Sequence, residues 1–430
     1  MKIALIVGTF PTLSETFVLN QMTGLLDQGH ELDIFAHSNP HMEKIHPDVE
    51  AYRLMERTHY LDMPSNKVKR VLKALGLLAV NFHKAPLRLL EALNVFKFGK
   101  EALSLRLLYA LVPFLGKEQE YDIIHCHFGP NGNIGMLLNN LGVRGRVITS
   151  FYGYDISAHV EQFGRTIYDP LFQQGDLFIA ISDAVNERLI RLGCDKDKVA
   201  KHPLGIDVEK FHSEERKRQI GEKVKILTVA RLVEKKGLEY SIKAVAKVVK
   251  KHPHVEYNVA GDGPLGSHLE SLISESGVKE QVRLLGWQDQ DQIRRLYQES
   301  HIFVLASVIA RNGDQEGTPT VLMEAQAQGL PIVSTLHSGI PEIVLDGRSG
   351  FLVPERDVDA LAERLQYLIE HPECWPEMGR AGRRFVEEHY DIKKLNRRLV
   401  EIYETLLAGQ PNQPDMSTSR EQEQGGDGEG

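Results

Sequence analysis

The feature that most constrains the fold is a regular alternation of short apolar runs with helical stretches, and this alternation occurs twice along the chain. Strands that alternate with helices indicate parallel sheets with crossover helices. The first series of strand-like runs is Ile3–Val7, Glu31–Ala36, Asp122–His125, Arg146–Thr149 and Leu177–Ala180. The second series is Lys225–Ala230, Tyr257–Ala260, Val282–Leu284, Ile302–Leu305, Pro331–Ser334 and Gly350–Val353. The sequence therefore predicts an α/β protein of two doubly wound, Rossmann-like domains that face each other across a cleft.

Changes in composition along the chain suggest where these domains begin and end. We expect a first domain over residues 1–210 and a second over 223–388, joined by a charged linker that has little to bury. A helical segment at 389–408 follows. Residues 410–430 are rich in Gln, Gly, Asp, Glu and Ser, a composition that predicts disorder.

Composition also excludes several classes of protein. The three cysteines of the 430-residue chain are scattered without C-x-x-C spacing, which argues against a disulfide framework or a zinc site and fits a reducing cytoplasm. The N-terminus carries one positive charge and a very short apolar run, so we read it as a first strand rather than a signal peptide. A formal net charge of −8 makes nucleic acid an unexpected partner.

Two carboxylates, Glu316 and Glu324, lie eight residues apart across a predicted junction between a loop and a helix. Thr318 is a suitable N-cap and Pro319 a suitable first helical residue, so the helix is expected to begin there. A helix N-terminus attracts phosphate, whereas neighbouring carboxylates accept hydrogen bonds from hydroxyl groups. This arrangement is typical of a nucleotide-sugar site, although Glu324 alone would also fit a solvated helix position.

The segment from Glu316 to Val333, with Gly339–Val344 and Gly350–Val353, resembles the nucleotide-binding half of the family-4 retaining glycosyltransferases, which have the GT-B fold. The resemblance implies that Glu316 holds hydroxyl groups of the donor sugar and that Glu324 holds those of the ribose. It also implies that the C-terminal helix packs back on the first domain. The other donor-binding residues that we expect here are Gly317, Thr318, Pro319, Thr320 and Gly339. Gly339 would let a backbone N–H approach phosphate, which a side chain would block.

A basic turn follows the first strand of the second domain. Arg231 and Lys236 can converge on one diphosphate, and in the resembled family these positions neutralise the leaving nucleotide. The register of the family's motif favours Lys236 over Lys235 for this role. A solvated basic turn is the alternative.

The run Gly261-Asp262-Gly263-Pro264-Leu265-Gly266 matches the dinucleotide fingerprint G-x-G-x-x-G. It follows the second strand of its domain rather than the first, and we expect Pro264 to open the next helix. Gly261 and Gly263 are therefore interpreted as a tight turn that lines the nucleotide site rather than as an NAD site.

The first domain supplies fewer motifs. Gly8, Thr9 and Ser14 belong to the loop after the first strand, where Ser14 would cap a helix and place Glu15 in its first turn. By resemblance to exopolysaccharide-type members with a Ser-Glu-Thr-Phe entry, this loop touches donor phosphate or acceptor. The usual Gly-Gly pair is absent from it.

His125 and His127 share one face of a strand end, one deeper and the other at the rim. The family places its active-site histidine at the second position, His127. Phe151-Tyr152-Gly153-Tyr154-Asp155 matches the family's His-Gly-x-Asp segment except that Tyr152 replaces the histidine. Asp155 would bond an acceptor hydroxyl or cap the following helix.

Residues 67–106 combine many basic with many apolar side chains. Such a segment suits a surface that rests on anionic lipid headgroups, but a pair of amphipathic helices packed on the domain has the same pattern. The basic residues are Lys67, Lys69, Arg70, Lys73, Lys84, Arg88, Lys97, Lys100 and Arg106. We expect a cytoplasmic protein, and this segment is the part that would lie peripherally on the inner face of the membrane.

The function that we predict is retaining transfer of a hexose from a UDP- or GDP-sugar to a saccharide or lipid-linked saccharide acceptor, in exopolysaccharide assembly of the colanic-acid or amylovoran kind. The catalytic set would be His127, Arg231, Lys236 and Glu316. We expect neither cofactor nor metal, because two cations already stand where a metal would neutralise the diphosphate. The alternatives are a nucleotide-sugar 2-epimerase of the same fold and a non-catalytic scaffold that binds sugar nucleotides.

Overall fold

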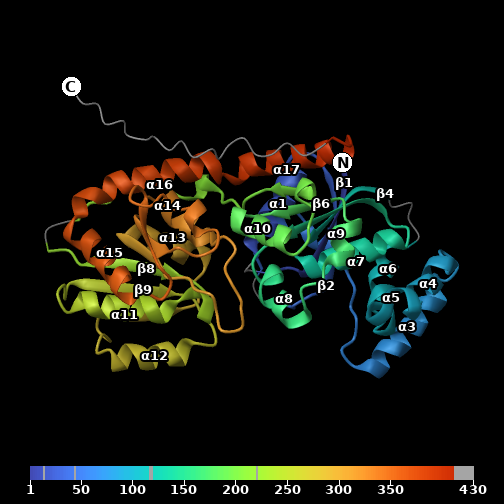
Figure 1. Cartoon of the computed structure of the whole chain (residues 1–430), viewed down its shortest axis with the longest axis horizontal. Coiled ribbons are helices and arrows are strands. Elements are labelled where there is room, and N and C mark those ends of the chain that lie inside the picture. The colour runs from blue at the N-terminus through green and yellow to red at the C-terminus, as the bar shows by residue number, and fades with distance from the viewer. Residues whose placement is uncertain (13–14, 43–44, 116–119, 219–220, 411–430) are drawn as a thin grey trace.

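The computed structural model describes residues 1–12, 15–42, 45–115, 120–218 and 221–410 (Figure 1). Ser14 and the tail from residue 411 onward, for which a capping role and disorder are predicted, lie outside the described residues.

The strands form two sheets. The strands of the first half are β1 (Lys2–Thr9), β2 (Glu31–Ser38), β3 (Thr58–Tyr60), β4 (Glu120–His127), β5 (Arg144–Phe151), β6 (Leu177–Ala180) and β7 (Val199–Lys201). Those of the second half are β8 (Val224–Val229), β9 (Val255–Ala260), β10 (Val282–Gly286), β11 (Ile302–Leu305), β12 (Ile332–Thr335) and β13 (Gly350–Val353). The spatial orders are β3-β2-β1-β4-β5-β6-β7 and β10-β9-β8-β11-β12-β13. Every pairing is parallel, which confirms the doubly wound α/β prediction.

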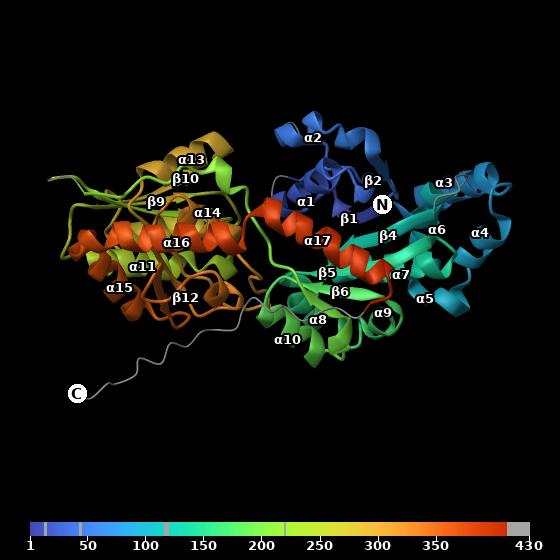
Figure 2. The same cartoon turned by 90° about the horizontal axis from the view of Figure 1, so that it is seen from above.

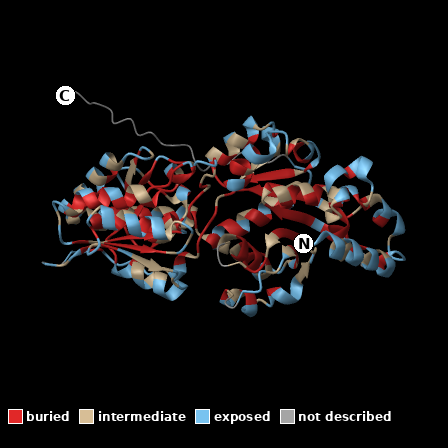
Figure 3. Cartoon of the chain, turned by 90° about the horizontal axis from the view of Figure 1, so that it is seen from below, coloured by how far each residue is buried: buried red, intermediate tan, exposed pale blue. Residues whose placement is uncertain are grey.

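Helices cover both faces of each sheet, which explains why the central strands are buried along nearly their whole length (Figure 3). The helices of the first half are α1 (Thr16–Asp27), α2 (Pro47–Ala51), α3 (Lys67–Asn81), α4 (Pro86–Ala92), α5 (Val95–Leu103), α6 (Arg106–Leu111), α7 (Gly129–Asn140), α8 (Ala158–Phe163), α9 (Asp169–Gln174) and α10 (Asp183–Arg191). The later helices are α11 (Leu238–Val249), α12 (Gly266–Glu275), α13 (Gln290–Glu299), α14 (Thr320–Ala327), α15 (Val358–Glu370), α16 (Trp375–His389) and α17 (Ile392–Leu407).

Three of the predicted helix starts are wrong. Helix α1 begins at Thr16 and Glu15 occupies its N-cap position, so Glu15 does not lie in the first turn. Helix α14 begins at Thr320, its N-cap position is Pro319, and no side chain caps it, so Thr318 is not the cap. Helix α12 begins at Gly266, after Pro264, because the two preceding residues continue the turn that leaves β9.

The strand orders place the predicted site residues at two switch points. In the first sheet the order reverses between β1 and β4, which end at Thr9 and His127. In the second it reverses between β8 and β11, and Arg231 follows β8 closely. Ligands of open parallel sheets bind outside the carboxyl ends of the strands at such reversals.

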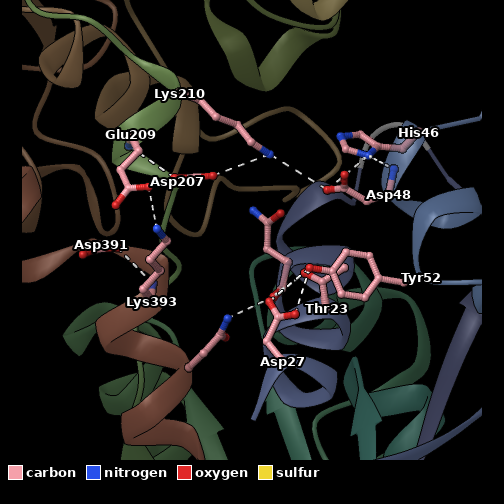
Figure 4. A network of polar contacts seen from close by, with 12 residues as sticks. Thr23, Asp27, His46, Asp48, Tyr52, Asp207, Glu209, Lys210, Asp391 and Lys393 are labelled. Atoms are coloured by element: carbon pink, nitrogen blue, oxygen red, sulfur yellow. Dashed lines mark hydrogen bonds and ion pairs between the residues drawn. The ribbon is translucent and has the colours of Figure 1, made fainter. Parts of the chain in front are cut away.

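The C-terminal helix links the two halves. Helix α16 lies on the second half, and α17 runs on across the first, beside α1 (Figures 1 and 2). Asn396 Nδ2 donates to the Asn20 carbonyl at 3.0 Å, and Lys393 Nζ pairs at 2.5 Å with Glu209 Oε2, close to the end of the first half (Figure 4). The neighbouring Lys210 lies 3.9 Å from Asp48 of α2. The last residues of the first half therefore contact both α17 and α2. None of the described helices is long and apolar enough to cross a bilayer.

Candidate active site

Two lysines of the second half converge on Glu316. Lys236 Nζ lies 2.5 Å from Glu316 Oε2, and Lys235 Nζ lies 3.4 Å from Glu316 Oε1 and 3.1 Å from Asp314 Oδ2. The lysines form a 3-10 turn after β8, and Gly237 then adopts a left-handed conformation, with φ of 62°. A Cβ on Gly237 would stand 1.6 Å from the Ala306 carbonyl oxygen, so only glycine lets this turn rest on the end of β11. Lys235, which register disfavoured, therefore reaches Glu316 together with Lys236.

Glu316 is held as a carboxylate. Burial would raise its pKa, but Lys236 and then Lys235 outweigh that effect and lower the pKa to about 2. The backbone of Glu316 is also fixed, because its N–H donates to His337 Nε2 at 3.1 Å. His337 Nδ1 in turn lies 2.6 Å from Glu355 Oε1, so the proton of this buried ring is on Nδ1. Both supporting residues were missed by sequence reasoning.

The loop around Glu316 touches the first half at the level of the backbone. A Cβ on Gly153 would stand 2.6 Å from the Gln315 carbonyl oxygen and 2.8 Å from the Gly317 nitrogen. A cavity of about 110 Å³ opens beside this contact, and its walls include Glu316 and Arg188 of α10. The predicted donor loop and the segment after β5 are therefore direct neighbours.

Gly339 also makes a close backbone approach, but not to an open phosphate site. Its N–H donates to the Gly317 carbonyl at 3.1 Å, and a Cβ would stand 2.9 Å from Thr318 Oγ1. The expectation that this N–H is presented to phosphate is wrong for this conformation. Thr318 Oγ1 is itself buried without a hydrogen-bond partner among the described residues. This unpaired hydroxyl therefore lies just before the uncapped start of α14.

Glu324 occupies the second turn of α14. Its Oε2 accepts a hydrogen bond from the buried Tyr297 hydroxyl at 3.0 Å. Burial raises its pKa, which the hydrogen bond from Tyr297 partly offsets. This contact excludes the alternative of a solvated helix residue.

His127 and Tyr152 form a buried pair at the end of the first sheet. His127 Nδ1 lies 2.6 Å from the Tyr152 hydroxyl oxygen, while Nε2 has no hydrogen-bond partner in the part of the chain that the structure describes. Burial lowers the pKa of His127 to about 3, so the ring is neutral at physiological pH. Tyr152, which replaces the family's histidine, thus orients the ring, while the buried Nε2 is left unpaired among the described residues.

A second histidine supports the first. The rings of His125 and His127 stack with centroids 4.5 Å apart, as expected for residues on one face of a strand. Both are fully buried, so the expected placement of one at the rim is wrong. His125 lies 2.6 Å from the Tyr403 hydroxyl of α17 and 2.7 Å from Ser150 Oγ. The C-terminal helix therefore reaches the predicted active-site histidine through one intermediate ring.

Asp155 has a structural role in this conformation. It is fully buried, and its carboxylate oxygens accept from the backbone N–H groups of Gly129 and Tyr152, each at 3.0 Å. Gly129 is the first residue of α7, so Asp155 stabilises the start of the preceding helix rather than the following one. An acceptor hydroxyl would have to compete with these bonds.

Glu15 is a further candidate that the sequence did not single out. Burial raises its pKa to about 7, and Arg231 of the opposite half lowers it. A carboxyl that titrates near neutral pH in a loop facing a cation is a common feature of functional sites. Gly8 and Thr9 lie at the end of β1 nearby, and a Cβ on Gly8 would meet no atom within 4 Å. Thr9 and Glu15 line a small hollow of about 10 Å³.

The turn after β9 packs against the loop that carries Arg231. A Cβ on Gly261 would stand 1.9 Å from the Ala230 carbonyl oxygen, and one on Gly263 would stand 2.7 Å from that of Leu232. The Leu232 N–H donates to the Asp262 carbonyl at 2.9 Å. These glycines therefore shape the Arg231 loop by close backbone contact.

Comparison with known proteins agrees with this geometry. Residues 210–385 match the sequence profile of the glycosyl transferases group 1, and residues 14–210 match that of glycosyltransferase family 4. The chain is 36% identical over 411 residues to an Escherichia coli (strain K12) protein named "Putative colanic acid biosynthesis glycosyltransferase WcaL". This match covers 94% of this chain and 100% of the relative. The chain is also 36% identical over 409 residues to the amylovoran biosynthesis glycosyltransferase AmsK of Erwinia amylovora, with the same coverage.

Solved structures share the fold. The crystal structure of Anabaena Alr3699/HepE in complex with UDP and glucose superposes with a TM-score of 0.70 at 17% identity, over 94% of this chain and 100% of that chain. The two profiles and the full-length relatives lead to one assignment: the chain belongs to family 4 of the glycosyltransferases and has the GT-B fold.

Proposed function

We propose that this glycosyltransferase moves a hexose from a UDP- or GDP-sugar to a lipid-linked saccharide, with retention at the anomeric carbon and without a metal. The observation that carries the proposal is the pairing of Lys235 and Lys236 with Glu316 at 3.4 and 2.5 Å, beside the start of α14. The turn after β8 thus offers ammonium groups for a diphosphate, and the loop before α14 offers a carboxylate for sugar hydroxyls.

The donor would bind on the second half, residues 223–388. Lys236 has three N–H donors and uses one on Glu316, so the others are free to contact phosphate. Arg231 would add a second cation, and Thr318 Oγ1 with the first N–H groups of α14 would complete the phosphate site. Glu316 would hold hydroxyls of the transferred sugar, and Glu324 those of the ribose.

The acceptor would bind on the first half, residues 1–210. We place its reacting hydroxyl near His127 Nε2 and Glu15, across from Arg231. The reaction is a front-face displacement in which the leaving phosphate takes the acceptor proton. The protein's contribution is then electrostatic, because the cations stabilise the charge that develops on the diphosphate.

The relatives support an exopolysaccharide role. WcaL and AmsK are named for colanic acid and amylovoran biosynthesis, and both match this chain along their whole length. The HepE structures contain UDP or UDP-glucose, whereas more distant relatives are GDP-mannose-dependent mannosyltransferases. Both nucleotide classes therefore belong in the assay.

The test uses UDP- and GDP-sugars labelled in the sugar, with lipid-linked oligosaccharide extracted from exopolysaccharide-producing cells. Thermal stabilisation by UDP, GDP, ADP and NAD is measured first to select the nucleotide. Transfer of label to the lipid fraction, lost in Glu316→Gln and kept in the matched Glu270→Gln variant on the exposed side of α12, would support the proposal. Conversion of the nucleotide-sugar at C2 without acceptor would establish the epimerase instead, and binding without either reaction would establish the scaffold.

A further inference from the structure

Helices α3, α4 and α5 expose an unusual number of apolar side chains. They lie at the outer end of the first half, on the side away from the second half (Figure 1). Of the 21 large hydrophobic side chains that are exposed among the described residues, 11 fall within residues 67–106. These are Val68, Val71, Leu72, Leu75, Val80, Phe82, Leu87, Leu90, Val95, Phe96 and Leu103, called the apolar surface below. A concentration of exposed apolar side chains on neighbouring helices marks an interaction site in a folded protein.

Packing on the domain does not account for these residues. Ala74 and Asn81 of α3 are buried against the first half, and Leu78 is partly buried there. Val68, Leu72 and Leu75 recur with helical spacing on the opposite side and are 57–68% exposed. The helix is therefore apolar on two sides, and only one of them has a partner within the chain.

The most exposed side chains lie on the next two helices. Phe96, near the start of α5, is fully exposed, and Leu87 of α4 is 80% exposed. Leu103 at the end of α5 is 71% exposed. Burying such side chains removes a large apolar area from water, which strongly favours association with a partner.

The charge of the segment selects that partner. Residues 67–106 hold nine Lys and Arg against two Glu, a net charge of +7, so the remainder of the chain carries −8 − 7 = −15. Both acids are paired within the segment, Glu91 with Lys97 at 2.5 Å and Glu101 with Arg106 at 3.8 Å. A second copy would bring equal positive charge to the same surface, and the acidic remainder would turn away from any anionic layer.

We propose that α3–α5 dock on an anionic lipid bilayer, with the apolar surface inserted among the headgroups and acyl chains and the lysines paired with lipid phosphate. An apolar face with Lys and Arg around it is the arrangement by which helices lie in the interface plane of a membrane. The surface places the first half, where the acceptor would bind, next to the bilayer.

The experiment is co-sedimentation of the full chain with vesicles of phosphatidylcholine alone or mixed with phosphatidylglycerol. We expect binding to the mixed vesicles only, and weaker binding as salt is raised. Lys67→Glu, Lys69→Glu and Lys100→Glu together should lower the partition coefficient at least roughly fivefold per residue. The matched control reverses Lys250, Lys251 and Lys279, which are exposed on the second half and give the same net charge.

The apolar contribution is tested separately. Leu72→Ser, Leu75→Ser and Phe96→Ser remove exposed side chains and should abolish sedimentation while the melting temperature stays unchanged. Phe163→Ser, 54% exposed on α8, is the control. Equal binding to neutral vesicles, no binding to either kind, or a concentration-dependent dimer abolished by the same three serines would overturn the proposal. None of these measurements uses transferase activity, so their failure is distinct from failure of the proposed reaction.

Discussion

The Tyr152 hydroxyl oxygen lies 2.6 Å from His127 Nδ1, and both residues are buried. Tyr152 also packs against the rings of Phe17 and Phe128, with centroids 4.9 and 4.5 Å away. The tyrosine is thus fixed on two sides by apolar contact, and its hydroxyl holds the imidazole in one orientation. The departure from the family's histidine at this position preserves a polar partner for His127.

Tyr152→Phe should lower kcat without a comparable change in KM for the donor. The substitution keeps the aromatic packing but leaves a buried ring nitrogen unsatisfied, at a cost of about 1–3 kcal/mol in the free energy of unfolding. Steady-state kinetics and thermal denaturation measure the two effects. Tyr152→His, which restores the usual residue, is the companion variant, and wild-type kinetics for Tyr152→Phe would contradict a role for this hydrogen bond.

Glu316→Gln should separate nucleotide binding from transfer. Removing the carboxylate beside Lys235 and Lys236 leaves more positive potential for a diphosphate, so affinity for free UDP or GDP should stay or rise. Transfer should fall by about hundredfold or more, because the contact to the sugar is lost. Calorimetry with the free nucleotide and label transfer with the nucleotide-sugar provide the comparison. A parallel loss of both would mean that Glu316 only maintains the loop.

Glu15→Gln should stabilise the protein more at pH 8 than at pH 5. The folded-state pKa of Glu15, about 7, is above the ordinary value of 4.5, so its contribution is fully present below 4.5 and is lost as pH rises through 7. The neutral amide removes that loss, which amounts to about 3 kcal/mol at pH 8. Denaturant unfolding at both pH values checks this. An equal change at the two values would mean that Glu15 is not titrating there.

The buried histidines should lower the stability of the fold at acidic pH, whereas Glu15 lowers it at alkaline pH. Burial lowers the pKa of His127 to about 3 and that of His202 to about 4, so stability is highest above pH 6.5 and falls as pH drops toward these values. His202→Gln should flatten the acid side of the stability curve. Melting temperatures from pH 7.5 down to about 4.5 test the slope, with His268→Gln on the surface of α12 as the control.

Tyr403→Phe should destabilise the protein by about 1–3 kcal/mol, because it removes the hydroxyl that contacts the buried His125. Because His125 stacks on His127, kcat should fall as well. Tyr367→Phe on the exposed side of α15 should leave both quantities unchanged. Loss of stability with normal kcat would show that α17 holds the fold but does not position the site.

The comparison of sequence and structure shows which structural features can be predicted from short stretches of sequence. Apolar runs predicted the long strands, but β3 and β7, each three half-buried residues at a sheet edge, carry too little pattern to be detected. The preference for Lys236 over Lys235 followed the spacing of the family's motif, and the 3-10 turn brings both lysines to Glu316. His337 and Glu355 support Glu316 through contacts that depend on the fold of two loops, and Tyr403 meets His125 across 278 residues of chain. A short stretch of sequence does not reveal contacts between residues so far apart in the chain.

The backbone contact between Gly153 and the Gln315–Gly317 loop limits how such enzymes can diversify. Two halves that meet only through side chains could be exchanged between relatives, with each interface residue adjusted in turn. Here the half that would select the acceptor and the half that would select the donor meet where no Cβ fits. A chimera that changes the sugar transferred must therefore carry the glycine and its facing loop as a matched pair, so recombination within this family is constrained at one short seam.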